Sequence, residues 1–410
     1  MAMTAKAISD GQYEPAALTY RRELRKNEMR RGVLVAPLLL YILMIFVLPI
    51  VIMLTRSIED PEIPSVLPRT AGLIKQWDGT ALPGGEVIAA LVADIKQAES
   101  DRSLGQAGIR LNYAIPGFQS LLLKTGQKLG NAPTADSLES LRQIDQRWTD
   151  NHYWLALRDA SSTYSLFYFR AALGLSNTVS ASEGRDLYIN VLARTLWMTA
   201  VVTSACVILG YPLAYFLAHL SDTLRSKLIM LVLLPFWTSL LVRTTAWFVL
   251  LQKHGLVNDL GIFLGLWSEP LELIYNRFAV YVAMTHVMLP FMVLPLYSVM
   301  LKIPGTYMNA AATLGAHPFR AFREVYLPLS FPGLGAGTLL VFIVTLGFYI
   351  TPALLGGPAD QMLSYYIAQN AGNFGNWGLA AALSVLLLAV VGAIIFLLGR
   401  FRTAKIIREA

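Results

Sequence analysis

Arg243 and His286 stand in the middle of long apolar stretches of this sequence. A charged group at such a position is costly to bury, so Arg243 is a functional candidate that can screen a charge on a bound molecule. The alternative is that Arg243 lies near the outer end of its helix, extends to the interface and pairs with a loop carboxylate. We interpret His286 as a hydrogen-bonded packing residue.

Aromatic side chains are a second set of candidates. Aromatic rings can hold an organic cation through cation–π contacts, and they also populate helix interfaces and the headgroup region, so both interpretations stay open. No Asp or Glu accompanies them in the apolar stretches, so a cation would need carboxylates from a partner chain, or the molecule is not a simple polycation. The candidate pathway residues, besides Arg243, are Trp237, Tyr297, Phe348 and Tyr349.

The sequence contains no motif of a catalytic or nucleotide-binding site. It contains no phosphate-binding loop of the Gly-x-x-x-x-Gly-Lys-[Ser/Thr] type, and the Gly333–Gly337 run suits close helix packing. No His, Asp or Glu cluster stands at the ends of the apolar stretches, and Cys206 is interpreted as a small buried hydrophobe. We expect no catalytic residue, no metal site and no cofactor bound by this chain.

Long apolar blocks dominate the 410 residues, of which 55% are hydrophobic and only 14% charged. Each block approaches or exceeds the roughly 20 residues that cross a bilayer, and none contains Asp, Glu or Lys. The sequence therefore predicts an all-α integral membrane protein with six transmembrane helices in contact with lipid. The blocks are Gly32–Leu54, Val191–Leu220, Leu228–Leu251, Phe278–Leu301, Leu329–Ile350 and Gly378–Leu398.

The net charge of +7 is distributed unevenly about these blocks. Sixteen basic residues lie in the two tails and in the loops that would share a side with them, whereas the short loops of the other side hold only Lys253 and Arg277. Positive charge accumulates on the cytoplasmic side, so both termini are predicted to be cytoplasmic. The charge is a topology signal and does not indicate nucleic acid.

The chain divides into five predicted parts: a cytoplasmic tail (1–32), a first transmembrane helix (33–56), an insert (57–187), a five-helix core (188–400) and a C-terminal cytoplasmic tail (401–410). The N-terminal tail is expected to form a helix over 16–31 on anionic headgroups. The insert has 12 basic and 15 acidic residues and helical periodicity near 87–95 and 138–148, which predicts a mostly helical extracytoplasmic domain. We hypothesise that the insert contacts a binding protein or caps the outer mouth through its run 164–169; the alternative places this run in the insert's own core or at the membrane interface.

The cytoplasmic segment 302–328 is too long for a simple turn. Pro304 can open a helix and Gly315 can close it in a left-handed C-cap. Pro318 then starts a second short helix, which we expect Pro328 to end at the membrane. Two short helices at an angle, with Ala310 and Ala311 facing outward, suit docking into a partner's cleft, although a purely structural loop has the same shape.

This segment resembles the coupling-loop motif of permease subunits in binding-protein-dependent ABC importers. That motif reads Glu-Ala-Ala, three residues, Gly, nine residues, Ile, one residue, Leu-Pro. The matching positions here are Ala310, Ala311, Gly315, Leu327 and Pro328, with Val325 in place of Ile and Asn309 in place of Glu. Further segments, 210–218, 235–238 with Arg243, 289–297 and 351–357, are similar to spermidine/putrescine-type permeases, so the resemblance covers about residues 33–56 and 188–400.

The resemblance implies the type I ABC importer permease fold, with Asn309, Ala310, Ala311, Gly315 and Pro328 coupling the channel to an ATPase. It also implies the partners: an ATPase dimer that binds ATP and Mg, a second permease subunit, expected to be a different chain, and a periplasmic substrate-binding protein. The location would be the bacterial inner membrane, and the cargo a polyamine or a related amine or amino-acid-derived solute. The alternative is a secondary transporter driven by an ion gradient, which usually shows intramembrane acidic residues and broken helices, neither of which the sequence predicts.

Overall fold

The computed structural model describes residues 35–130, 137–175 and 187–409, with side chains to residue 396. The predicted tail helix over 16–31 lies outside these residues. The described residues are helical, with one isolated bridge between Glu59 and Tyr164. Five helices among them are long and apolar enough to cross a membrane, and a bent pair supplies a sixth span when it is counted as one. The all-α multi-pass membrane fold predicted from the sequence is confirmed.

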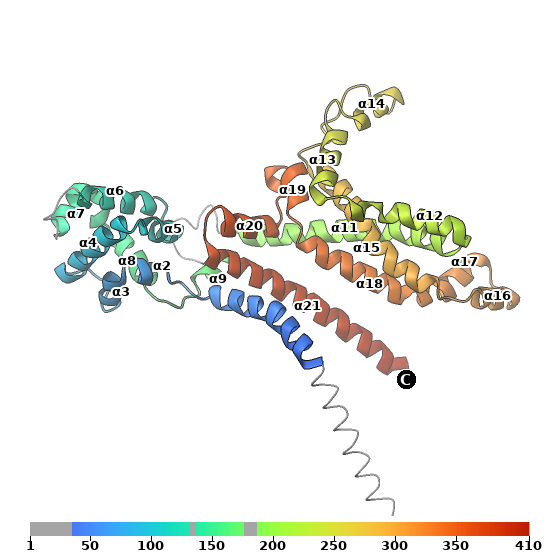
Figure 1. Ribbon diagram of the computed structural model, residues 1–410, viewed down its shortest axis with the longest axis horizontal. Coiled ribbons are helices and arrows are strands. Elements are labelled where there is room, and N and C mark those ends of the chain that lie inside the picture. The colour runs from blue at the N-terminus through green and yellow to red at the C-terminus, as the bar shows by residue number, and fades with distance from the viewer. Residues whose placement is uncertain (1–34, 131–136, 176–186, 410) are drawn as a thin grey trace, which may run out of the picture. The chain divides into compact units, whose positions relative to one another are not determined.

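The first span is the helix Val35–Arg56, which forms a unit separate from the rest of the chain. The second unit begins at Ser57 with short helices of the insert (Figure 1). Helices α4 and α7 fall where the hydrophobic periodicity predicted them. The insert helices are α2 (Glu62–Val66), α3 (Pro68–Ile74), α4 (Gly85–Ser100), α5 (Leu104–Ala114), α6 (Phe118–Gly130), α7 (Leu138–Ile144), η1 (Gln146–Thr149), α8 (Asn151–Asp159) and α9 (Phe167–Ala172).

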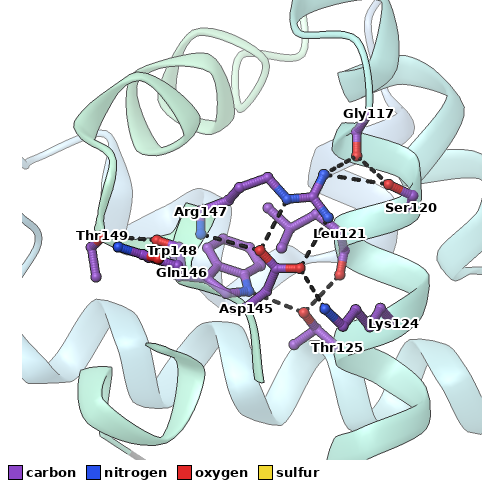
Figure 2. A network of polar contacts seen from close by, with 10 residues as sticks. All are labelled: Gly117, Ser120, Leu121, Lys124, Thr125, Asp145, Gln146, Arg147, Trp148 and Thr149. Atoms are coloured by element: carbon purple, nitrogen blue, oxygen red, sulfur yellow. Dashed lines mark hydrogen bonds and ion pairs between the residues drawn. The ribbon is translucent and has the colours of Figure 1, made fainter. Parts of the chain in front are cut away.

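The insert has a hydrophobic core of its own, in which Phe118, Trp148 and Trp154 are fully buried. A polar network surrounds one edge of this core (Figure 2). Asp145 accepts hydrogen bonds from Arg147 Nε at 3.0 Å and from Lys124 Nζ at 2.8 Å, and Trp148 Nε1 donates to Thr125 Oγ1 at 3.0 Å. These contacts join α6 to η1.

The core helices follow the insert, and α11, α15 and α18 lie side by side. A Cβ atom at Gly333 would lie 2.9 Å from Val299 Cβ, and one at Gly337 would lie 2.9 Å from Met292 Sδ, so the predicted packing role of these glycines is confirmed. The core elements are α11 (Leu187–Ala218), α12 (Asp222–Leu233), η2 (Leu234–Trp237), α13 (Leu240–Leu251), α14 (Leu256–Phe263), α15 (Arg277–Met300), α16 (Gly305–Thr313), α17 (Pro318–Ala321), η3 (Phe322–Tyr326), α18 (Leu327–Leu346), α19 (Ile350–Leu355), η4 (Pro358–Asp360), α20 (Leu363–Gly372) and α21 (Trp377–Glu409).

The expectation of an unbroken span over 228–251 is wrong. The helical stretch that ends at Trp237 and the one that begins at Leu240 meet at an angle of 98°. Pro235 lacks the N–H that would continue the helix, and Thr238 and Ser239 adopt extended backbone conformations. The expectation that no helix is broken therefore fails at this point.

The insert and the core meet at α9. Tyr168 is buried in a cluster with Val191 of α11, Leu363 of α20 and Leu379 of α21. Tyr113 of α5 donates a hydrogen bond to Asn370 Oδ1 of α20 at 2.9 Å. The aromatic run 164–169 thus uses Tyr168 to attach the insert to the core, a contact that neither interpretation of the run anticipated. Tyr164 remains 68% exposed.

Candidate functional site

Helix α16 is bounded by the two residues that the sequence singled out. Pro304 precedes it in an extended conformation, with φ −64° and ψ 132°. Gly315 follows it with φ +82°, donating its N–H to the carbonyl of Ala312 at 2.9 Å, while Ala316 donates to Ala311 at 3.0 Å. This pair of bonds is a Schellman motif, which requires a left-handed residue and so favours glycine. The predicted left-handed cap is confirmed.

The inner side of α16 rests on the core. Ile303 and Met308 are partly buried and pack against the main cluster, which also includes Phe322. The ring of Phe322 stacks on that of Tyr326, and its edge contacts Tyr215 of α11 at 5.6 Å between centroids. Helix α16 is thus connected through η3 to both α11 and α18.

The outer side of α16 and α17 has no partner among the described residues. Leu314 is 88% exposed and Phe319 is 69% exposed, although both are large hydrophobic side chains. No residue of α16 is fully buried. Asn309 and Ala310 are exposed, whereas Ala311 is half-buried, so only part of the predicted outward pair faces outward. Leu314 at the end of α16 and Phe319 in α17 are five positions apart, and exposed apolar surface of this kind marks an interaction site.

Pro328 does not end a helix, contrary to the expectation from the sequence. The helical stretch from Pro318 to Leu346 is continuous, and a π-helical turn, η3, ends at Tyr326, two residues before the proline. The wider hydrogen-bonding pattern of a π turn relieves the clash between a proline ring and the preceding carbonyl groups. Helix α17 is consequently joined to span α18 without a break.

The structure records no side-chain contact that brings the predicted pathway residues together. Trp237 is 72% exposed at the bend, Tyr349 is exposed, and Tyr297 and Phe348 are half-buried and pack against the main core. Arg243 lies in the first turn of α13, after the bend, and its Nε and Nη1 have no hydrogen-bond partner among the described residues. No loop carboxylate pairs with Arg243 among the described residues.

A cavity of about 310 Å³ lies beside the bend, lined by α11, α12, η2 and α15. His286 lines it together with Pro235 and Pro290, and Trp247 Nε1 lies 3.3 Å from His286 Nδ1. Sequence reasoning missed Trp247, because its relation to His286 depends on the bend. No signal in the sequence identified Phe319 as exposed.

Comparison with known proteins gives a consistent group of relatives for the core. No protein-family model matches the sequence. The spermidine/putrescine transport system permease protein PotB of Escherichia coli K12 is 34% identical over 223 residues, which are 54% of this chain and 80% of PotB. PotB of Haemophilus influenzae is 35% identical over 52% of this chain and 75% of its own length. The inner membrane ABC transporter permease protein YdcU of Escherichia coli K12 is 34% identical over 52% of this chain and 72% of its own.

A solved structure of a bacterial ABC transporter involved in the import of the acidic polysaccharide alginate is also similar. Its TM-score is 0.46 at 16% identity, over 58% of this chain and 82% of the solved chain.

Proposed function

The chain belongs to the family of permease subunits of spermidine/putrescine-type ABC importers, and from this premise we propose that it couples the motion of a separate ATPase to alternating access of a solute pathway. As a family member it is a non-catalytic membrane subunit of an ABC importer. The observation that carries the proposal is the outward surface of α16 and α17, on which Leu314 and Phe319 are exposed. We call this surface, formed by Tyr307, Ala310, Leu314 and Phe319, the docking face.

The docking face fits a cleft in the ATPase. Apolar side chains at the centre of an interface contribute most of its binding energy when they enter a partner's pocket. Gly315 fixes the angle between α16 and α17, so the two helices form a single rigid surface for the partner. Asn309, where the family motif has Glu, is exposed and supplies an amide in place of a charge. We therefore expect the contact with the ATPase to depend little on salt at this position.

The coupling mechanism rests on rigid connections behind the docking face. Closure of the ATPase dimer on ATP displaces α16, and the packing of Met308 and Phe322 carries the displacement into the core. Tyr211 of α11 shares a hydrogen bond of 2.9 Å with Ser330 of α18, so the two spans move together. A rigid-body displacement of this kind moves a transporter between inward-open and outward-open states.

The solute pathway is proposed to pass the bend at Pro235. The cavity lined by His286 lies there, and Arg243 follows the bend. The predicted spans contain no Asp or Glu. A polyamine or a related amine would therefore take its carboxylate partners from the second permease subunit, which we expect to be a different chain. A periplasmic binding protein delivers the solute, and both termini lie in the cytoplasm.

The alternative of a secondary transporter is not retained. The break at Pro235 is a feature that such transporters share, but the relatives are ABC importer permeases. The break instead belongs to the proposed pathway of the importer.

Co-purification of the ATPase subunit tests the proposal. Phe319→Asp and Leu314→Asp should each reduce the amount of ATPase retained on the tagged permease, because a charge in an apolar pocket is costly to desolvate. The matched control is Tyr164→Asp in the insert, where the wild-type side chain is 68% exposed. If both docking-face variants retain as much ATPase as the control, the docking face does not bind that subunit.

A further inference from the structure

A second cavity, of about 300 Å³, lies where the insert meets the core. Helices α2, α5 and α9 form one side of it, and the segment between α20 and α21, with the first residue of α21, forms the other. The polar residues that line it are Glu62, Gln106, Arg110 and Asn376. Tyr168, Phe374 and Trp377 supply aromatic walls. Its composition combines apolar surface with a few polar groups, as in sites for small molecules.

Three of the lining residues each keep a buried polar atom without a hydrogen-bond partner among the described residues. These atoms are Nη1 of Arg110, Oε2 of Glu62 and Nδ2 of Asn376. Arg110 is 3% exposed and Asn376 is 5% exposed. Buried polar groups are nearly always paired, so three unpaired atoms around one cavity indicate that something else completes them. Two of the atoms belong to hydrogen-bond donors and one is a carboxylate acceptor.

The rest of the Arg110 and Asn376 side chains is fixed by contacts within the protein. Arg110 donates from Nε to Asp60 Oδ1 at 2.7 Å, and its guanidinium lies 3.7 Å from the ring centroid of Phe167. Asn376 accepts a hydrogen bond from the N–H of Leu379 at 3.0 Å, which caps α21. The groups are therefore held in place before any ligand arrives.

The charges at this cavity do not cancel. Two carboxylates, Asp60 and Glu62, share the single charge of Arg110, which forms its ion pair with Asp60. Burial, with the adjacent Asp60, raises the pKa of Glu62. An ammonium group next to Glu62 would remove this penalty, and the face of Trp377 could accept the same cation.

We propose that this cavity binds a small zwitterion that carries both a primary ammonium and a carboxylate, as amino acids do. Arg110 and Asn376 supply donors to the carboxylate, and Glu62 accepts from the ammonium. A volume of about 300 Å³ admits a ligand of this size. The ligand contacts both the insert and the core, so its binding stabilises their contact. The site lies apart from the proposed solute pathway and does not depend on the docking face.

The test uses the purified full-length chain in detergent, without ATPase, and measures thermal unfolding against ligand concentration. The probes are two zwitterions, L-alanine and 4-aminobutanoate, and two matched molecules with one charge each, butylamine and butyrate. A ligand that binds only the folded state stabilises it increasingly as the ligand concentration exceeds its Kd, so the unfolding temperature keeps rising with concentration. At least one zwitterion should raise this temperature in a concentration-dependent manner, and neither singly charged molecule should match it at equal concentration.

Two conservative variants assign the effect to the cavity. Glu62→Gln keeps the shape and removes the charge, and Asn376→Asp keeps the helix cap while replacing the amide donor with a carboxylate. Each should weaken zwitterion binding about tenfold or more, because each removes a charge-assisted hydrogen bond. Glu86→Gln, on an exposed position of α4, is the control and should leave binding unchanged.

Three results would overturn the proposal. The first is no temperature shift with either zwitterion, which would leave water as the sole occupant. The second is an equal shift with butylamine, which would make the cavity a simple cation site. The third is a zwitterion response that persists unchanged in both Glu62→Gln and Asn376→Asp, which would place the binding elsewhere.

Discussion

Tyr168 of the insert packs so closely against Gly378 of α21 that a Cβ atom at Gly378 would lie 2.2 Å from Cε2 of the tyrosine ring. The two residues are 210 positions apart, and they join the insert to the last span. No side chain larger than hydrogen fits at residue 378 unless the ring moves. The insert is thus attached to the core by a close steric fit.

Replacing Gly378 with alanine should loosen this contact. The added methyl group forces Tyr168 out of its position, and overpacking of this kind costs about 1–3 kcal/mol. Hydrogen exchange should then increase in α9 and at the start of α21. Gly392→Ala is the control in the same helix, because a Cβ atom there has no neighbour within 4 Å. Equal exchange in the two variants would show that the contact between Tyr168 and Gly378 does not hold the insert.

The predicted topology can be tested with the single native cysteine left in place, because Cys206 is buried. A cysteine introduced at Gly130, exposed at the end of α6, should react with a membrane-impermeant thiol reagent added to intact spheroplasts. A cysteine at Thr313, exposed on α16, should react only after lysis. The opposite pattern would invert the orientation of the protein.

Acid should weaken the insert through Asp145. Hydrogen bonds from Arg147, with one from Lys124, hold the pKa of Asp145 well below its usual range. A carboxyl group with a depressed pKa in the folded state stabilises that state above its unfolded pKa of about 3.9, and this contribution is lost as the pH falls further. Asp145→Asn should therefore destabilise the insert by roughly 2 kcal/mol at pH 7, and the difference from wild type should shrink towards pH 3.

The measurement for Asp145 is the unfolding temperature between pH 7 and pH 3. Glu139→Gln is the control, because Glu139 is exposed and its Oε2 makes only a long surface contact, of 3.7 Å, with Arg142 Nη1. A difference between Asp145→Asn and wild type that stays constant across this range would show that the ionised carboxylate is not its cause.

The parts of the fold that the sequence predicted are those set by local physical chemistry. Block length and hydrophobicity predicted the spans, and the conformational preference of Gly315 predicted the end of α16. The bend after Pro235 was missed, because a proline within an apolar block either kinks or ends a helix according to its packing. The continuity of the helix through Pro328 depends on the π turn before it. No residue type in that segment predicts a π turn.

The packing partners of single aromatic residues were the least predictable features. Tyr168 and Tyr164 belong to one run, yet Tyr168 is buried against α21 and Tyr164 is exposed. The exposure of Phe319 likewise depends on how α17 is placed on the core. Such contacts join residues far apart in the chain, so periodicity within a segment cannot indicate them.

The ratio of solute uptake to ATP hydrolysis, measured for the complete importer in proteoliposomes, tests the coupling role of this chain most directly. Gly315→Val places a β-branched residue at φ +82°, with a strain of roughly 1–2 kcal/mol, and so misdirects α17 relative to α16. Gly265→Val imposes a similar strain at φ +69°, on a loop away from the docking face, and serves as the control. We expect the ratio to fall severalfold in Gly315→Val while ATP hydrolysis continues, and Gly265→Val to keep the wild-type ratio. A wild-type ratio in Gly315→Val would contradict the coupling role of this chain.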